Sequence, residues 1–89
     1  MIEFDIVLTS EAQADIRKLA PALRNRILDK LEWMGVNTQL LRHQSLRGKE
    51  WTGVFKYRVG SYRIIYQLDT QVKKLIVLKV RHRSDVYKL

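Results

Sequence analysis

Residues 51–68, WTGVFKYRVGSYRIIYQL, constrain the fold most strongly, because they have the pattern of two β-strands joined by a tight turn. Gly60-Ser61 is a dipeptide typical of two-residue β-hairpin loops. A turn at this point fixes which residues of the two strands face each other. The predicted cross-strand pairs are Val59–Tyr62, Arg58–Arg63, Tyr57–Ile64 and Lys56–Ile65.

Side chains along a β-strand point alternately to the two faces of the sheet, so this pairing divides the hairpin into two groups. The predicted core face carries Phe55, Tyr57, Val59, Tyr62, Ile64, Tyr66 and Leu68. The opposite face carries Lys56, Arg58 and Arg63, with Val54, Ile65 and Gln67 beside them.

Arg58 directly opposite Arg63 is an unfavourable pair, because like charges at facing positions repel. One interpretation is a solvated outer face on which salt screens the repulsion. Three cations gathered on one face favour a second interpretation, a binding site for an anion. Phosphate is the anion that suits them, because arginine offers it a bidentate fork and lysine a point charge.

The net charge of +8 is unevenly distributed along the 89 residues. Residues 1–41 contain five Lys/Arg and six Asp/Glu, whereas residues 42–89 contain twelve Lys/Arg and three Asp/Glu. The excess therefore belongs to the half with the hairpin. A basic surface of this kind is typical of nucleic-acid binding, and it also suits an acidic protein partner.

Length and composition predict one domain spanning residues 1–89, in a reducing cytoplasm and without a membrane span. The chain has no cysteine, which excludes disulfides and thiolate metal sites. Its longest apolar run, residues 75–78, is far shorter than the roughly 20 residues of a transmembrane helix. The first residues, MIEFDIVL, lack the basic region of a signal peptide.

The first half predicts a strand followed by two helices. Residues 2–8 alternate partly between apolar and polar side chains, as a strand does. Ser10 and Gln13 match a capping box, which predicts a short helix ending near residue 19 with Ala12, Ile16 and Leu19 buried. Pro21 suits the first turn of a second helix, which Gly35 can end. Its buried positions are predicted to be Leu23, Ile27, Leu31 and Met34.

The second half predicts a loop and a three-stranded antiparallel meander. Residues 36–50 have the character of a basic loop, and residues 69–71 that of a turn. Residues 74–81 form the third strand, with Ile76, Leu78 and Val80 expected on one face and Leu75, Val77, Lys79 and Arg81 on the other. The short link between the helices predicts that they form an antiparallel pair. The order of strand, helix pair and three-stranded meander predicts an α+β fold with the helices on one face of a mostly antiparallel sheet.

The sequence lacks the common nucleotide, zinc and serine-hydrolase motifs, and we expect neither a metal nor a cofactor. The second half holds three scattered carboxylates, too few for a two-metal nuclease. Metal-free cleavage of RNA is possible, because the 2′-hydroxyl can attack the adjacent phosphate. That reaction requires a proton acceptor, a proton donor and cations near the phosphoryl oxygens.

His82 and Tyr87 are the candidates for proton transfer. His82 has the more suitable ordinary pKa, whereas Tyr87, with an ordinary pKa of about 10, needs neighbouring cations to favour its phenolate. The alternatives are that Tyr87 packs its ring on the sheet and that His82 is a surface residue. Trp51 could stack on a base or pack at the rim of the core, and Trp33 is expected to be partly buried. We assign no role to His43.

Together, the segments LRGKEW, FKYRVGSYRIIYQL and LIVLKVRHRSDVYK resemble the RelE/ParE superfamily of bacterial and archaeal type II toxins. The resemblance covers essentially the whole chain, and RVGSYRIIY and HRSDVY are its most specific parts. It implies a small α+β toxin that a co-expressed antitoxin silences. The RelE branch of the superfamily cleaves mRNA in the ribosomal A site, and the ParE branch poisons DNA gyrase.

The RelE-type site uses two basic residues on one strand, an arginine after the hairpin turn, a further arginine and a C-terminal tyrosine. The resemblance places these on Lys56, Arg58, Arg63, Arg81 and Tyr87. Arg58 departs from the lysine that would act more readily as a base. The loop before HRSDVY is shorter than in the family, and relatives carry Gly-His-Arg there, so His82 is a further catalytic candidate. Lys79 and Arg83 are predicted to add to the RNA-binding cations.

These observations predict a ribosome-dependent mRNA endoribonuclease, with the ribosome, mRNA and an acidic, amphipathic antitoxin as its partners in a hetero-oligomer. The alternatives are a gyrase inhibitor without nuclease activity and an inactive family member that only binds its antitoxin.

Overall fold

The β3–β4 hairpin at the centre of the fold forms with the pairing that its turn predicts. In the computed structural model, which describes residues 3–45 and 53–88, β3 (Phe55–Val59) pairs antiparallel with β4 (Tyr62–Asp69). Arg58 lies opposite Arg63 and Lys56 opposite Ile65, so the predicted register is confirmed. The predicted position Trp51 lies outside the described residues.

Among the described residues the sheet has five strands in the order β1-β5-β4-β3-β2; the N-terminal strand and the three strands of the meander were predicted, and β2 was not. β1 (Asp5–Leu8) pairs parallel with β5 (Lys74–His82) at one edge. β2 (Gln44–Ser45) pairs antiparallel with β3 at the other edge, inside the segment predicted to be a loop. Its two exposed residues carry no hydrophobic alternation, so the sequence pattern gave no strand signal there.

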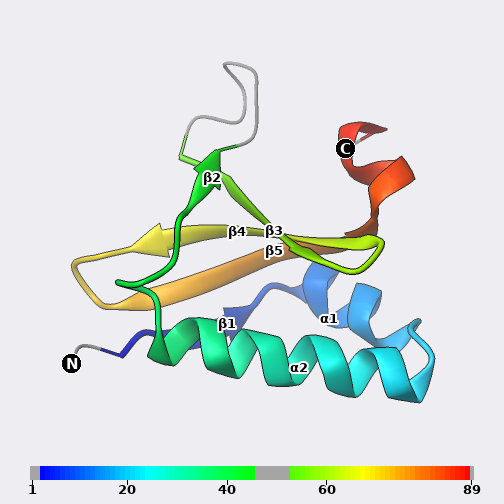
Figure 1. Cartoon of the computed structure of the whole chain (residues 1–89), viewed down its shortest axis with the longest axis horizontal. Helices are drawn as coiled ribbons and strands as arrows, with labels where there is room; N and C mark the ends of the chain where they lie inside the picture. The colour runs from blue at the N-terminus through cyan, green and yellow to red at the C-terminus, as the bar shows by residue number, and fades with distance from the viewer. Residues whose placement is uncertain (1–2, 46–52, 89) are drawn as a thin grey trace.

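The helices α1 (Ser10–Arg17) and α2 (Pro21–Val36) both lie on one side of the sheet, and the chain reverses direction between them (Figure 1). The 3₁₀ helix η2 (Arg83–Lys88) follows β5 and rises on the opposite side (Figure 1). The α+β class, with a strand, a helix pair and antiparallel strands, is confirmed. In the described part of the chain, neither helix combines the length and the apolarity that crossing a bilayer requires.

The cap of α1 is Thr9, one residue before the predicted Ser10. The Thr9 hydroxyl accepts the backbone N–H of Ala12 at 3.1 Å, and the hydroxyl also donates to the Leu78 carbonyl at 3.0 Å. Gln13 donates to the Leu8 carbonyl instead of completing a capping box. Thr9 is the better cap here because one side chain closes the helix and joins it to β5.

Gly35 does not end α2, contrary to the prediction, but lies buried inside its last turn. Its carbonyl accepts the backbone N–H of Phe4 at 2.9 Å. A Cβ at this position would lie 2.6 Å from the Phe4 carbonyl oxygen. Glycine is therefore required for close approach between α2 and the chain entering β1.

The predicted faces of β5 were partly wrong, because the ladder with β4 contains a bulge. Ile65 pairs with Lys79 and Tyr66 with Val77, so Leu78 has no partner in this register. The extra residue shifts the alternation by one position. Leu75, Val77 and Val80 consequently all become buried.

The core lies between the helices and the sheet. It contains the predicted helix positions Ala12, Ile16, Leu19, Ile27, Leu31 and Met34 together with Phe4, Val59, Ile64, Tyr66, Leu75, Val77 and Val80. Phe55, Tyr57, Tyr62 and Leu68 pack against it from the predicted core face, and so does Leu23 of α2.

His43, to which the sequence assigned no role, joins the segment after α2 to the centre of the sheet. Its Nε2 lies 2.9 Å from the Thr38 carbonyl, which can only accept, so this nitrogen carries the proton. Nδ1 then accepts the Tyr66 hydroxyl at 2.5 Å. Tyr66 is fully buried, and its burial raises the pKa of its phenol to about 12, with Tyr57 adding to the shift.

Candidate phosphate-binding site

Five basic residues occupy two adjacent rows of the sheet, on the face that carries Ile65. The register aligns Arg58, Arg63 and Arg81 across β3, β4 and β5. In the next row Ile65 separates Lys56 from Lys79. We call this surface the cationic face; its members are Lys56, Arg58, Arg63, Lys79 and Arg81. Side chains at facing positions start about 5 Å apart, so each arginine lies beside the next.

The cationic face is not merely a solvated surface, because the apolar side chains beside its cations are buried. Val54 is 5% exposed and Ile65 is fully buried, although neither belongs to the main core. Lys56 and Arg63 are half-buried, whereas Arg58 is exposed. An anion at Arg63 would therefore meet charges with reduced access to water, where electrostatic attraction is stronger than on an open surface.

Arg58 and Arg63 have no carboxylate partner among the described residues. Arg58 Nε donates to the Gly60 carbonyl at 3.4 Å, and Arg63 Nη1 donates to the Tyr62 carbonyl at 3.2 Å. Each guanidinium has five N–H donors, so these bonds leave most of their donors for a ligand. Two adjacent arginines of this kind can bind phosphate oxygens from two directions.

Lys79 and Arg81, by contrast, are paired with carboxylates of α1. Arg81 Nε donates to Asp15 Oδ2 at 3.0 Å, and Arg81 Nη2 donates to Glu11 Oε2 at 2.6 Å. Lys79 Nζ lies 3.0 Å from the same Glu11 oxygen. The carboxylates neutralise this end of the cationic face and leave its uncompensated charge near Arg58 and Arg63.

Asp15 holds Arg81 in place by a buried contact. Its carboxylate is 8% exposed, and its Oδ2 also accepts the backbone N–H of Val80 at 3.0 Å, where β5 extends beyond its pairing with β1. The hydrogen bond to Asp15 raises the pKa of the Arg81 guanidinium above its ordinary value, and nearby carboxylates add to the shift. Arg81 therefore remains a cation and is unsuited to giving up a proton.

His82 lies on the opposite face of β5 from the arginine row, because neighbouring residues of a strand alternate, although Arg81 and His82 both line a cavity of about 290 Å³. The register places His82 beside Tyr62, and the two rings meet edge-on with centroids 5.4 Å apart. His82 Nδ1 accepts the backbone N–H of Ser84 at 3.3 Å and lies 2.9 Å from the Ser84 hydroxyl. These contacts indicate that the His82 side chain stabilises the start of η2.

Arg83 and Tyr87 both belong to η2. The Arg83 backbone N–H donates to the Ser61 carbonyl at 2.7 Å, which joins η2 to the hairpin turn, and the Arg83 side chain is exposed. The backbone of Tyr87 lies in η2, on the side of the sheet away from the helices (Figure 1). The side chain of Tyr87 lies outside the described residues.

Glu11 and Asp15 are the functional neighbours that sequence reasoning missed. They are four residues apart on α1, so they share one helix face, and this spacing was a usable signal. Their partners on β5 are more than sixty residues away in the chain, and no local pattern indicates such a contact.

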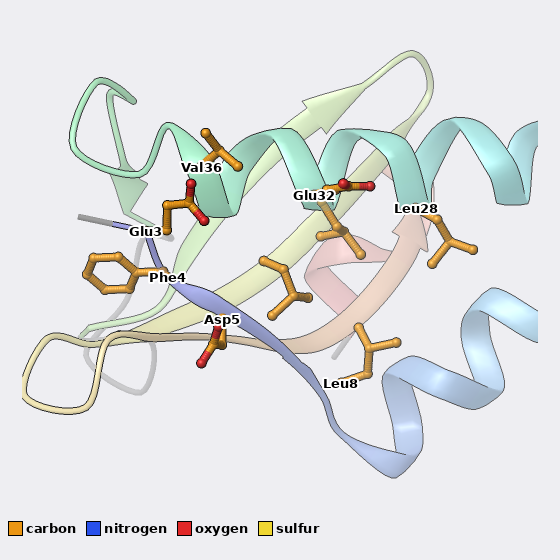
Figure 2. Close-up of a pocket in the computed structure, with 9 residues that line it drawn as sticks. Glu3, Phe4, Asp5, Leu8, Leu28, Glu32 and Val36 are labelled. Atoms are coloured by element: carbon orange, nitrogen blue, oxygen red, sulfur yellow. The ribbon is translucent and has the colours of Figure 1, made fainter. Parts of the chain in front are cut away.

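A groove of about 390 Å³ between β1 and α2 has the opposite character from the cationic face (Figure 2). Apolar side chains including Leu8, Leu28 and Val36 line it, and its charged residues are Glu3, Asp5 and Glu32. It therefore repels phosphate. Within the described ranges, no three His, Cys, Asp or Glu side chains converge as a metal site would need.

Comparison with known proteins relates this architecture to toxins of toxin–antitoxin systems. The sequence model of the family described as the ParE toxin of type II toxin–antitoxin system, parDE, matches residues 6–87. Toxin RelG of Mycobacterium tuberculosis is 27% identical over 85 residues, which cover 96% of this chain and 97% of RelG.

Solved structures of such toxins have the same fold. The RelBE2 toxin–antitoxin complex of M. tuberculosis contains a chain that is 27% identical, with a TM-score of 0.82 and coverage of 96% of this chain and 97% of that one. A mutant of the E. coli toxin RelE in the free state is 23% identical, with a TM-score of 0.75 and coverage of 97% and 92%.

Proposed function

This chain belongs to the ParE toxin family of type II toxin–antitoxin systems, and we propose that it is a ribosome-dependent endoribonuclease that cuts translated mRNA in the A site. The observation that carries the proposal is the pair Arg58 and Arg63, adjacent cations without carboxylate partners in the described part of the chain. Their repulsion is relieved when the phosphodiester monoanion of RNA lies between them, and more so when the dianionic phosphorane of the transition state forms there.

In the proposed reaction, the 2′-oxygen of the RNA attacks the adjacent phosphorus and the bond from phosphorus to the 5′-oxygen breaks. The 2′-hydroxyl proton passes to a base, and a proton is delivered to the departing 5′-oxygen. The products are a 2′,3′-cyclic phosphate and a 5′-hydroxyl. Arg58, Arg63 and Lys56 stabilise the negative charge that develops on the phosphoryl oxygens.

Tyr87, or a deprotonated basic neighbour, is proposed to accept the 2′-hydroxyl proton. Arg81 is proposed to assist the leaving group by its charge alone, because Asp15 favours its protonated form. His82 is the remaining candidate for donating the proton, and this role requires it to leave its contacts with Tyr62 and Ser84. Lys79 and Arg83 are proposed to contact flanking phosphates.

The proposed protein partner is a cognate antitoxin. The similar RelBE2 chain was solved as a toxin–antitoxin complex. An acidic, amphipathic segment of the antitoxin would neutralise the cationic face and block access of RNA to Arg58 and Arg63.

The test is to induce the wild type and Arg63→Ala in a bacterium and to map mRNA 5′ ends, with purified ribosomes as the matching assay in vitro. Removing one charge-stabilising donor should slow cleavage by about 10²- to 10³-fold. Arg17→Ala is the control, because Arg17 is an exposed cation of α1 outside the cationic face. New cuts bearing 5′-phosphate ends, instead of 5′-hydroxyl ends, would exclude the proposed chemistry.

The second candidate is inhibition of DNA gyrase without nuclease activity, and the matching ParE family model favours it. A supercoiling assay with purified gyrase separates the two functions. Inhibition of supercoiling together with intact mRNA would establish the gyrase function and reject the nuclease.

A further inference from the structure

A groove between α2 and β3 combines an exposed tryptophan and a half-buried tyrosine with cations. It has a volume of about 450 Å³, and α2 passes beneath the hairpin turn at this point (Figure 1). Arg26, Lys30 and Trp33 line it from α2, and their spacing of four and three residues places them on one helix face. The opposite wall is formed by Tyr57, Arg58, Val59 and Gly60. Asp29 is the one carboxylate among the described residues that line the groove.

Trp33 forms the apolar part of the groove and remains accessible. The residue is 45% exposed, which agrees with the partial burial that the sequence predicted and leaves part of it open to a ligand. Its ring centroid lies 6.5 Å from that of Tyr57, with the planes tilted by 52°. Lys30 Nζ lies 4.7 Å from the Trp33 ring centre and 6.0 Å from that of Tyr57. A flat, exposed ring beside a cation suits a nucleotide base with its phosphate.

The groove adjoins the cationic face at Arg58, which borders both. Arg58 is exposed at the end of the arginine row and also lines the groove beside Tyr57. On the other side of the turn, the Arg26 guanidinium lies 3.4 Å from where a Gly60 Cβ would be. A strand of RNA bound at Arg63 could therefore continue past Arg58 towards Lys30 and Arg26.

We propose that this groove binds an unpaired nucleotide of RNA, whose base stacks on Trp33 while Arg26, Lys30 and Arg58 contact its phosphates. The inference rests on the proposed action on RNA and names a further contact of the same substrate class. The lining favours RNA over an amphipathic helix of a protein. Such a helix docks on aliphatic surface, whereas the one aliphatic side chain here, Val59, is buried.

The test uses a labelled, mixed-sequence 2′-O-methyl RNA oligonucleotide of roughly ten nucleotides, a length within the usual range of single-strand sites. It lacks the attacking hydroxyl and cannot be cut by the proposed chemistry. Fluorescence anisotropy gives its affinity for the purified chain. Trp33→Leu should weaken binding about tenfold, as loss of one stacked base does, and Trp33→Phe should recover part of the loss.

Arg26→Ala with Lys30→Ala should weaken binding and lower the slope of log affinity against log salt by about one and a half. Arg17→Ala removes one exposed cation outside the groove; it is the control for a non-specific charge effect and should bind nearly as the wild type does. In a Trp51→Phe background Trp33 is the sole tryptophan, and stacking should quench its emission. Circular dichroism confirms that each variant is folded.

Unchanged binding by Trp33→Leu would overturn the inference. So would a loss of affinity in Arg17→Ala as large as that in the Arg26→Ala, Lys30→Ala double variant. Quenching of Trp33 by an acidic amphipathic peptide but not by the oligonucleotide would also overturn it and identify a protein-docking site. Failure of the proposed function looks different: the wild type would leave ribosome-bound mRNA intact while still binding the oligonucleotide at Trp33. If Trp33→Leu cleaved mRNA as fast as the wild type at every substrate concentration, the proposed contact of the groove with RNA would be rejected and the proposed nuclease function would stand.

Discussion

At the scale of single residues, the cationic face contains two kinds of basic side chain. Lys79 and Arg81 are paired with carboxylates, whereas Arg58 and Arg63 donate only to backbone carbonyls within the described part of the chain. Salt bridges lower the energy of the first kind in the unliganded protein. Arg58 and Arg63 still repel each other, so a bound anion lowers their energy more than it lowers that of Lys79 and Arg81. This difference supports our proposal that Arg58 and Arg63 bind phosphate.

Asp15→Ala should lower the free energy of unfolding by about 2 kcal/mol, because it leaves the buried Val80 N–H without its acceptor and removes a charged partner from Arg81. Asp15→Asn should cost less, since its amide oxygen can still accept from Val80. Urea denaturation measures both variants. Glu11→Gln is the control and should change stability by less than about 1 kcal/mol, because its pairs are exposed. Equal effects at the two positions would contradict the role assigned to Asp15.

Tyr66 should make the fold sensitive to alkali. Its pKa is about 12 in the folded chain and about 10 when unfolded, so the folded state holds the phenol proton more tightly. The resulting stability is complete below pH 10 and is lost as the pH rises from about 10 towards 12. The expected loss is up to roughly 3 kcal/mol.

Tyr66→Phe should remove this part of the alkaline loss. At neutral pH it should cost about 1–3 kcal/mol, because Nδ1 of the half-buried His43 loses its donor. Stability curves of the two proteins from pH 8 to 12 give the comparison, since the remaining titratable groups are common to both. An equally steep alkaline decline in Tyr66→Phe would show that another group is responsible.

At the scale of elements, α1 and its cap hold the part of β5 that follows Val77, where the pairing with β1 ends. Thr9 and Asp15 supply hydrogen bonds to the backbone of β5, and Glu11 pairs with two of its side chains. The bulge at Leu78 turns Val80 into the core and leaves Lys79 and Arg81 directed to the outer face. The position of the arginine row therefore depends on the bulge as well as on the hairpin.

Gly35→Ala should destabilise the protein, although alanine is the better helix former by about 1 kcal/mol. The added methyl group would lie 2.6 Å from the Phe4 carbonyl oxygen, so α2 and the start of β1 must move apart. Overpacking of this kind costs roughly 1–3 kcal/mol. Chemical denaturation provides the measurement. Asn25→Ala, at an exposed position of the same helix, should instead be neutral or slightly stabilising. Stabilisation by Gly35→Ala would mean that the close contact carries no strain.

At the scale of the whole molecule, the β1–α2 groove is acidic, whereas the cationic face is basic and only its Lys79 and Arg81 end is paired with carboxylates of α1 among the described residues. The β1–α2 groove presents three carboxylates, whereas the cationic face presents five basic residues. A partner that covers both surfaces must itself carry two different charge patterns. An acidic segment suits only the cationic face.

Affinity for the cognate antitoxin should fall as salt rises from about 0.1 M to about 1 M, where the screening length shortens from about 10 Å to about 3 Å. The physical reason is that the antitoxin is expected to neutralise Arg58 and Arg63. Titration calorimetry at several salt concentrations gives the slope. Arg58→Ala with Arg63→Ala should flatten it, and Arg17→Ala should leave it nearly unchanged. A salt-independent affinity would exclude an electrostatic mode of inhibition.

The amino-acid sequence by itself determined the hairpin, its register, its two faces and the apolar stripes of the helices, because a two-residue turn and periodic side chains are local properties. Only the tertiary structure decided which cations remain uncompensated. Asp15 and Arg81 meet across sixty-six positions of the chain, and the bulge at Leu78 follows from how β4 and β5 pack together. The sequence likewise did not predict the close contact between Gly35 and the Phe4 carbonyl. A glycine that ends a helix and a glycine that allows close packing look the same in the sequence. Such contacts depend on where distant segments come to lie, and local periodicity contains no information about that.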